Sequence, residues 1–370
     1  MPTVRFKRLR AWSFVSAAIF AALFALSAPL PAANSVHRTH HAPALRLTAP
    51  AAETLFVRIL QSDDLFAYKG RQITTYWTTG RAIDVEVYHQ PPDFSRIYYL
   101  DPENLHGRLL VSDGKQQWQY DPHRHELRHR QLSPGALESD DLLSYSLLRT
   151  NYLLSVDPLP RTWVERKAWL VTIKRPGGRT LARRFWVDAG SGLILKREIY
   201  REDGRLAVTV AFSDINFHVK PLPGLSMATL AKTPGVRRVE TRSAAESPLP
   251  LTAVDAQLSG KAYAPSTLSG YHLVGASTTN DGGKPLLHLR YSDGLNLVSL
   301  FELRRTLPQR PTRAPAGMRV IQIGAVRGHV SHHSSLTTLN WDTSALNVTL
   351  MGELSVDALR TLASEAVRGR

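Results

Sequence analysis

The stretch that decides the fold is Phe185-Trp186-Val187-Asp188-Ala189-Gly190-Ser191-Gly192-Leu193-Ile194-Leu195-Lys196-Arg197-Glu198. Two runs of strand-forming residues flank a turn of Asp, Gly and Ser, which is the pattern of a β-hairpin. Residues 111–122 repeat this pattern around Asp113-Gly114, a dipeptide typical of tight hairpin turns. Repeated hairpins predict an open, curved antiparallel sheet with one polar and one apolar face, which could hold an acyl chain.

Further strands are expected on both sides of this stretch. Residues 81–89 alternate strictly, and we expect Ile83, Val85 and Val87 on one face, together with Ile73 of the preceding strand. The other expected strands are 68–77, 95–100, 109–112, 116–120, 126–132, 163–165, 169–174, 181–188, 193–200 and 206–212. A short helix is expected at 51–61. The segment 138–152 is predicted to form one or two helices that cover the sheet as a lid.

A second, smaller unit is expected after a stretch rich in Pro, Ser, Ala and Thr, which is typical of a linker. Its expected strands are 271–277, 285–291, 295–303, 319–326, 336–342 and 346–351. A closing helix over 355–367 has Ser355 at its N-cap and Asp357 in its first turn. The predicted boundaries are 51–219 for the large domain, 220–264 for the linker and 265–370 for the C-terminal domain.

The start of the chain predicts export to the periplasm. A basic segment without acidic residues precedes an apolar run over 11–26, and prolines with small residues follow at 29–34. This order is typical of a secretory signal peptide, here 1–33, cleaved near Ala32 or Ala33. An uncleaved membrane anchor is the alternative, because 11–30 is about long enough to span a bilayer. Residues 34–50 are then expected to be a disordered spacer.

Composition excludes several kinds of chemistry. None of the 370 residues is a cysteine, which excludes disulfides, thiolate catalysis and a lipidated N-terminal cysteine. The net charge of +15 favours anionic phospholipids, glycolipids or an acidic segment of a membrane protein as partners, and a solvated basic surface is the alternative. Aromatic residues do not alternate with Arg and Lys as on a nucleic-acid stacking surface. We therefore expect no nucleic-acid partner.

Motifs for catalysis and metal binding are missing from the sequence. It has no Gly-rich phosphate loop, no Gly-x-Ser-x-Gly turn and no His-Glu-x-x-His. The best metal candidate is the set Asp121, His123, His125 and His129, because residues 123 and 125 share one face of a strand. A solvated hairpin rim is the favoured alternative, since a metal site also needs a second shell of contacts. We expect no enzyme activity, no metal and no cofactor.

Large apolar side chains concentrate on the strands of the larger part. On a flat sheet they would need a second sheet to cover them, whereas a curved sheet around a helix and a lid can enclose them. A filled core and a pocket for one apolar ligand both remain open. The candidate lining residues of such a pocket are Ile73, Trp77, Val85, Val87, Trp118, Tyr120, Trp169, Trp186 and Phe212.

Residues 111–122 and 185–196 resemble hairpins of the LolA-type fold of outer-membrane lipoprotein carriers. This resemblance implies a mainly β (α+β) chain. Its larger part would be a LolA-like half-open antiparallel β-barrel with a short N-terminal helix and a helical lid, and a smaller α+β domain would follow.

Over residues 51–367 the chain resembles the MucB/RseB family more closely. Four segments carry this resemblance in the family's order: Tyr68-Lys69-Gly70-Arg71-Gln72, Ser226-Met227-Ala228-Thr229-Leu230-Ala231-Lys232, Tyr291-Ser292-Asp293-Gly294-Leu295, and Met351-Gly352-Glu353-Leu354-Ser355 with the helix after it. The family's apolar strand at the start of its small domain is poorly matched, because 249–265 holds Tyr263 but no Trp.

The resemblance implies a non-enzymatic periplasmic regulator of the envelope stress response. Such a protein binds the periplasmic domain of a transmembrane anti-sigma factor and restrains its proteolysis, thereby controlling a sigma factor. The resemblance also implies that lipid, glycolipid or lipoprotein acyl chains bound in the large domain release the regulator from the anti-sigma factor. The alternative is a LolA-like periplasmic carrier of lipoproteins or lipids. Homo-oligomer formation is left open.

A basic group of residues surrounds the Pro- and Arg-rich segment 308–317. The resemblance implies that the small domain makes much of the partner contact, and this group is a candidate for binding the partner or a lipid headgroup. A solvated loop is the alternative, because exposed basic clusters are screened by salt. The candidates are Arg304, Arg305, Arg310, Arg313 and Arg319.

Overall fold

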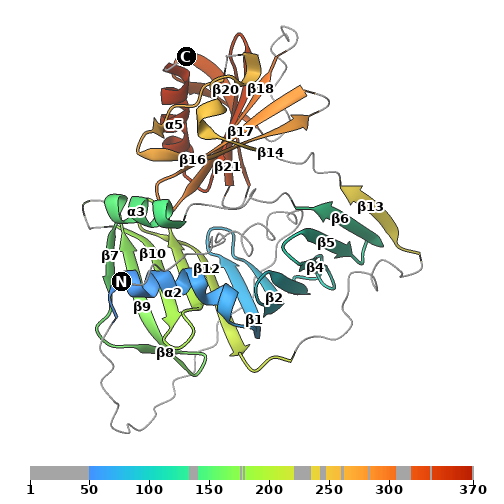
Figure 1. The fold of residues 1–370 in the computed structure, drawn as a ribbon, viewed down its shortest axis with the longest axis vertical. Helices are drawn as coiled ribbons and strands as arrows, with labels where there is room; N and C mark the ends of the chain where they lie inside the picture. The colour runs from blue at the N-terminus through green and yellow to red at the C-terminus, as the bar shows by residue number, and fades with distance from the viewer. Residues whose placement is uncertain are drawn as a thin grey trace, which may run out of the picture.

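The computed structural model describes residues 50–132, 141–175, 177, 180–220, 235–241, 247–259, 262–281, 284–305, 318–333 and 336–368. Within them the chain forms a larger sheet of 13 strands and a smaller sheet of 9 strands (Figure 1). The described α-helices are α2 (Ala52–Leu65), α3 (Asp141–Asn151) and α5 (Val356–Arg368). The predicted mainly β class is confirmed. The expected leader and the spacer up to residue 49 lie outside the described residues.

The larger sheet is an open sheet. Its strand order is β13-β6-β5-β4-β3-β2-β1-β12-β11-β10-β9-β7, with β8 paired to β9. The end strands β13 and β7 are not neighbours in the described part of the chain, as the predicted half-open architecture requires. The strands are β1 (Tyr68–Tyr76), β2 (Arg81–Gln90), β3 (Phe94–Asp101), β4 (Leu109–Ser112), β5 (Gln116–Asp121), β6 (Glu126–Gln131), β7 (Leu153–Val156), β8 (Arg161–Trp163), β9 (Arg166–Lys174), β10 (Leu181–Asp188), β11 (Ile194–Tyr200), β12 (Leu206–Asn216) and β13 (Arg237–Thr241).

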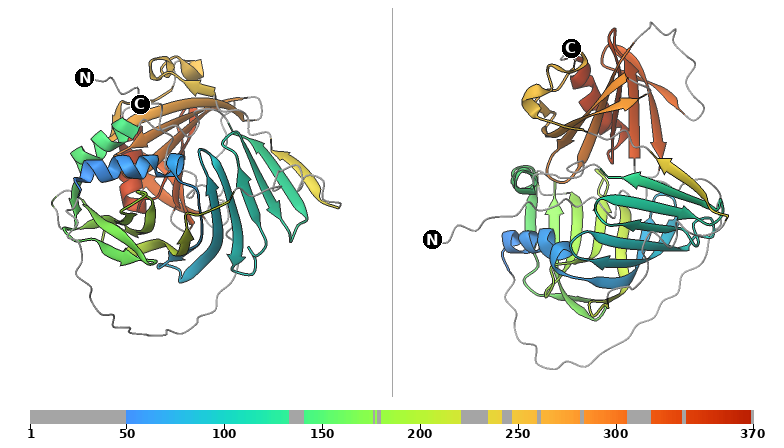
Figure 2. Two further views of the ribbon diagram at one scale, coloured as in Figure 1. Left: turned by 60° about the horizontal axis from the view of Figure 1, so that its bottom comes forward. Right: turned by 45° about the vertical axis from the view of Figure 1, so that its right-hand side comes forward.

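Hairpin connections and shifts of strand register account for the curvature of this sheet (Figure 2). Short turns join successive strands as antiparallel hairpins, including the predicted Asp113-Gly114 turn between β4 and β5. The register shifts at residues 71/72 in β1 and at 186/187 in β10, and such irregularities increase the twist and bend of a sheet. Helix α2 lies across the strands of the larger sheet (Figure 1).

The smaller sheet has the order β14-β16-β17-β18-β22-β21-β20-β19, with β15 paired to β16. Helix α5 packs on it, and Ser355 caps this helix by accepting a hydrogen bond from the amide of Ala358 (3.1 Å). Leu359, Leu362 and Ala363 are buried in the core below α5. The strands are β14 (Ser247–Leu249), β15 (Thr267–Leu268), β16 (Tyr271–Asp281), β17 (Lys284–Ser292), β18 (Leu297–Arg304), β19 (Arg319–Ile323), β20 (Val326–His333), β21 (Leu336–Asp342) and β22 (Leu346–Gly352).

The stretch 220–264, expected as a linker, contributes described elements to both sheets. Strand β13 pairs in parallel with β6, and Arg237 lies opposite Glu126. Strand β14 pairs with β16, while Val254 and Leu258 are buried in the core of the smaller sheet. Because the side chains of β13 are largely exposed, this strand has no apolar alternation that the sequence could reveal.

One expected strand, 319–326, is in fact the start of a hairpin. Strands β19 and β20 pair around Gly324, whose φ of 54° fits a glycine in a tight turn. No Asp or Asn marks this turn, which is why the sequence pattern does not reveal it. No helix among the described residues combines the length and apolarity needed to cross a membrane.

Candidate functional site

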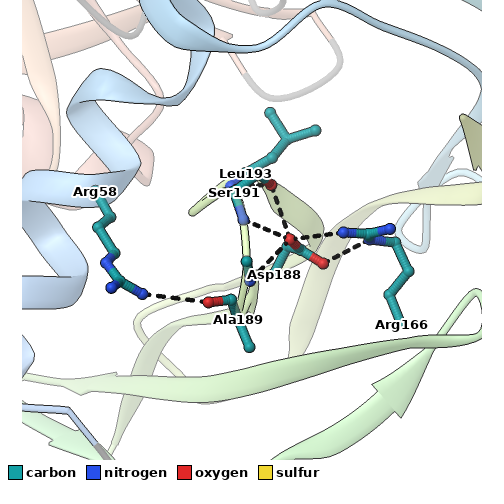
Figure 3. Close-up of polar contacts among 7 residues, drawn as sticks. Arg58, Arg166, Asp188, Ala189, Ser191 and Leu193 are labelled. Carbon is teal, nitrogen blue, oxygen red and sulfur yellow. Dashed lines mark hydrogen bonds and ion pairs between the residues drawn. The ribbon is translucent and has the colours of Figure 1, made fainter. Parts of the chain in front are cut away.

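The hairpin turn at 189–192 is organised by one buried carboxylate, Asp188 (Figure 3). Arg166 donates to it from Nε (2.6 Å) and from Nη2 (3.0 Å), and the amide and hydroxyl of Ser191 donate at 2.7 and 2.9 Å. Burial alone would raise the pKa of Asp188, but the hydrogen bonds from Arg166 and Ser191 outweigh it and hold the pKa below its usual value. The turn is therefore fixed by a charge at the end of β10.

This turn positions helix α2 on the sheet. Arg58 of α2 donates to the carbonyl of Ala189 (3.2 Å; Figure 3). Gly192 has a φ of 81°, and a Cβ built on it would lie 2.7 Å from the Arg58 carbonyl oxygen, closer than real Cβ atoms approach. Only glycine allows the helix and the turn to come this close.

Helices α2 and α3 cover one face of β9 and β10. Leu55 of α2 and Leu148 of α3 are buried in the same hydrophobic cluster as Trp169 and Phe185 of these strands. The helices also contact each other, because Tyr145 stacks on Phe56 with ring centroids 4.7 Å apart. The predicted helical segment 138–152 is thus a covering helix at Asp141–Asn151.

A second cluster continues over the sheet from β1–β3 to β9–β12 and holds a half-buried lysine at its border. Lys196 Nζ lies 4.3 Å from the ring centroid of Trp186 and 4.7 Å from that of Trp163, and it forms an ion pair with Glu198 (2.9 Å). Trp163 Nε1 donates to the carbonyl of Phe212 (2.9 Å). A cation between two indole faces is a favourable arrangement. Neither Lys196 nor Trp163 is among the candidates that the sequence indicates.

The nine candidate lining residues do not share one surface. Val85, Val87, Trp186 and Phe212 are buried together in the second cluster, whereas Trp169 is buried in the cluster under α2. The other four lie outside both clusters: Ile73, Trp77, Trp118 and Tyr120.

Cross-strand pairing explains this separation, because paired residues share a face and successive residues alternate. Ile73 pairs with Asp84, and Gln72 pairs with Val85. The expectation that Ile73 faces the same way as Val85 and Val87 is therefore wrong. The alternation within one strand is visible in the sequence, but the register between two strands is not.

The remaining aromatic candidates lie outside the two clusters. Trp77 is 56% exposed beyond the end of β1 and donates from Nε1 to Thr209 Oγ1 (2.9 Å). Trp118 stacks on His129 with ring centroids 3.9 Å apart, and Tyr120 is half-buried two residues further on the same face of β5.

Two of the four candidate metal-ligating residues, Asp121 and His129, have other partners. Asp121 forms an ion pair with Arg108 (2.9 Å), and His129 contacts Glu240 through Nδ1 (2.7 Å) and Gln116 through Nε2 (3.0 Å). Among the described residues, no group of three or more His, Cys, Asp or Glu side chains is placed to hold a metal ion.

The basic candidates of the smaller sheet are dispersed. Arg305 is tied to the turn before β22 by an ion pair with Asp342 (3.6 Å) and a hydrogen bond to the carbonyl of Thr343 (3.0 Å). Arg304 ends β18, while Arg319 lies on β19, four strand positions away, which is about 19 Å at the usual strand spacing. Arg310 and Arg313 lie outside the described residues.

No family model and no curated protein matches this sequence. The fold is similar to one chain in the complex of Pseudomonas aeruginosa MucA and MucB, with a TM-score of 0.54, 18% sequence identity, and coverage of 85% of this chain and 98% of that chain. A structure of MucB in complex with MucA(peri) gives a TM-score of 0.52 and 17% identity, with the same coverage. The expected resemblance to MucB/RseB is thereby confirmed as a likeness of fold.

Proposed function

We propose that this chain is a non-enzymatic periplasmic regulator that binds the periplasmic domain of a transmembrane anti-sigma factor and restrains its proteolysis. The observation that supports this most is the likeness of fold to structures in which MucB and MucA form a complex. The likeness covers 85% of the chain. The last described strand of the larger sheet ends at Thr241, so the likeness must also include part of the smaller unit. A carrier of the LolA type would need only the larger unit.

The partner surface proposed here is on the smaller sheet. Arg319 is exposed on β19, the outermost of the described strands of this sheet. An exposed edge strand can pair with an extended segment of another protein, and the basic side chain of Arg319 favours an acidic segment. Arg305 is held by Asp342 and is therefore a structural residue rather than a docking residue.

The carrier function remains the second candidate because the larger sheet carries an apolar cluster separate from the one under α2 and α3. Burial of an acyl chain there would contribute about 0.8 kcal/mol per CH₂ group. Val85, Val87, Trp186 and Phe212 would line such a site together, since they share one cluster. Phospholipid, glycolipid or lipoprotein acyl chains are the ligands proposed for this site.

The test is capture from native envelopes by the tagged mature chain, with bound proteins and lipids identified by mass spectrometry. We expect one single-pass membrane protein that also binds a sigma factor. The variant Arg319→Glu should reduce its recovery, whereas Arg205→Glu should not, because Arg205 is an exposed arginine beside the larger sheet. Lipids or many lipoproteins without such a membrane protein would refute the regulator and support the carrier.

A further inference from the structure

The turn 292–296 between β17 and β18 makes the main polar contact between the two sheets. This turn lies against helix α3 of the larger sheet (Figure 1). Tyr152, which follows α3, donates its hydroxyl to Asp293 (2.6 Å), and Asn151 donates to the Asp293 carbonyl (3.0 Å). Arg183 of β10 donates to Asn296 Oδ1 (2.9 Å). Residues of the turn and of the larger sheet thus form one hydrogen-bonded network.

Gly294 at the tip of the turn makes the closest approach. Its φ is 92°, and a Cβ built on it would lie 2.6 Å from Leu148 Cα and 2.7 Å from the Leu147 carbonyl carbon. Both atoms belong to the backbone of α3, which cannot move aside as a side chain can. Any side chain at 294 would therefore push the turn away from the helix.

The polar groups at this contact are hydrogen-bonded to one another. Asp293 is buried, and its carboxylate also accepts hydrogen bonds from the amides of Leu295 (2.9 Å) and Asn296 (2.7 Å). Burial raises the pKa of Tyr152, and the charge of Asp293 raises it further, so the hydroxyl stays protonated and donates. Burial lowers the pKa of Arg183, whereas the charge of Glu353 from the smaller sheet's last turn opposes this.

Beyond this turn, the described residues show few contacts between the two units, and one of them is the charge of Glu353 near Arg197 and Tyr76 of the larger sheet. The core under α5 forms its own cluster, and among the described hydrophobic residues Leu295 alone joins the smaller sheet to the clusters of the larger one. No strand of one sheet pairs with a strand of the other in the described ranges. A further hydrogen bond runs between two exposed side chains, from the Ser355 hydroxyl to Glu202 (2.7 Å). Contacts between units that are small and polar, rather than large and apolar, permit relative motion.

We propose that the turn 292–296 is a releasable latch that holds the smaller sheet against the covering helix α3. When α3 moves off the larger sheet, the latch opens and the two sheets separate. Movement of α3 is therefore coupled to the position of the smaller sheet. If the proposed function is right, this coupling decides which arrangement of the two units the partner meets, and that consequence rests on the proposed function.

The latch is tested on the full mature chain without any partner. The chain contains no cysteine, so the two substitutions Leu159→Cys and Val320→Cys create a unique pair of labelling sites. Both positions are exposed, one on each unit, at 66% and 62%. Double electron–electron resonance between spin labels at the two sites then reports the distance distribution between the sheets.

In this labelled background Gly294→Ala should lengthen and broaden the distribution, and the matched control Gly270→Ala should not. Gly270 has a similar φ of 85°, but nothing lies within 4 Å of a Cβ added to it. Gly270→Ala therefore has only the energetic cost of an alanine at positive φ, without a clash. Hydrogen exchange in 141–151 should also become faster in Gly294→Ala. Equal distributions and equal exchange for both variants would overturn the latch.

A milder variant tests the latch even if Gly294→Ala fails to fold. Tyr152→Phe keeps the ring and removes the hydroxyl, and we expect about a tenfold rise in the separated fraction, the factor that 1.4 kcal/mol represents. Tyr68→Phe removes a similar hydroxyl, which donates to Asp63 (3.2 Å) within the larger unit, and should leave the distribution unchanged. An unchanged distribution in Tyr152→Phe would contradict the proposal. Partner capture is not involved, so the latch and the proposed function can fail separately.

Discussion

At the scale of single residues, buried charges fix the turns that shape the molecule. Asp188 is 1% exposed, yet Arg166 and Ser191 satisfy both of its oxygens. A buried carboxylate with such partners is strongly destabilising when it loses them. The position of Asp188 before Ala-Gly-Ser-Gly predicts a turn residue, but its ion pair with Arg166, 22 residues earlier in the chain, depends on the register of β9 and β10 and could not be predicted.

We predict that Asp188→Asn lowers the free energy of unfolding by about 2 kcal/mol, because a charged hydrogen-bonded pair is lost while an amide oxygen remains as acceptor. Chemical denaturation at pH 7 measures this. Asp203→Asn is the matched control, since Asp203 also joins a hairpin turn to an arginine but lies at the surface. A loss in Asp188→Asn no larger than in the control would contradict this role.

The lowered pKa of Asp188 also predicts a pH dependence. Because the folded-state pKa is below the unfolded one, its contribution is complete above the unfolded pKa of about 3.9 and is lost as pH falls through the folded pKa. Below about pH 4 the stability of the parent chain should therefore fall more steeply than that of Asp188→Asn. Parallel curves in acid titrations of the two proteins would show that the carboxylate is not responsible.

At the scale of elements, close packing between a turn and a helix places α2 on the larger sheet. We predict that Gly192→Ala destabilises the chain by about 1–3 kcal/mol more than Gly177→Ala, because only the first adds a clash to the cost of a positive φ. The two glycines have φ values of 81° and 83°, and nothing lies within 4 Å of a Cβ at 177. Thermal unfolding of both variants checks the difference, and equal losses would disprove the tight approach.

Trp186 and Trp118, two of the four tryptophans among the cavity candidates, should differ in how much their removal destabilises the chain. Trp186 is 7% exposed within a core cluster, so Trp186→Ala should cost about 3–5 kcal/mol. Trp118 stacks on His129 outside the clusters, and Trp118→Ala should cost about 1 kcal/mol, the usual worth of an aromatic pair. Denaturant unfolding measures both; similar values would mean that the assignment of faces is wrong.

Sequence patterning predicts most strands, and physical reasons explain its failures. Strands that alternate between faces, such as β2, and helices with an apolar stripe, such as α5, were placed within a few residues. Strand β13 was missed because its largely exposed side chains show no apolar alternation, and the β19–β20 turn was missed because only Gly324 marks it. The grouping of candidate residues failed where it needed the register between strands, as at Ile73.

At the scale of the whole molecule, two open sheets with separate cores are joined by a few polar contacts, of which the turn 292–296 makes the largest group. Such an assembly can respond as two bodies, whereas a single closed barrel would respond as one. The proposed regulator would give each of the two units its own task. The carrier alternative gives the smaller unit no task.

The most direct measurement is a calorimetric titration of the purified mature chain with the purified periplasmic segment of the membrane protein that it captures. We predict saturable binding with a dissociation constant of about 1 μM or tighter, weakened by Arg319→Glu and unchanged by Arg205→Glu. Binding that does not saturate up to about 1 mM, with both variants equal to the parent chain, would contradict the claim that this protein binds an anti-sigma factor.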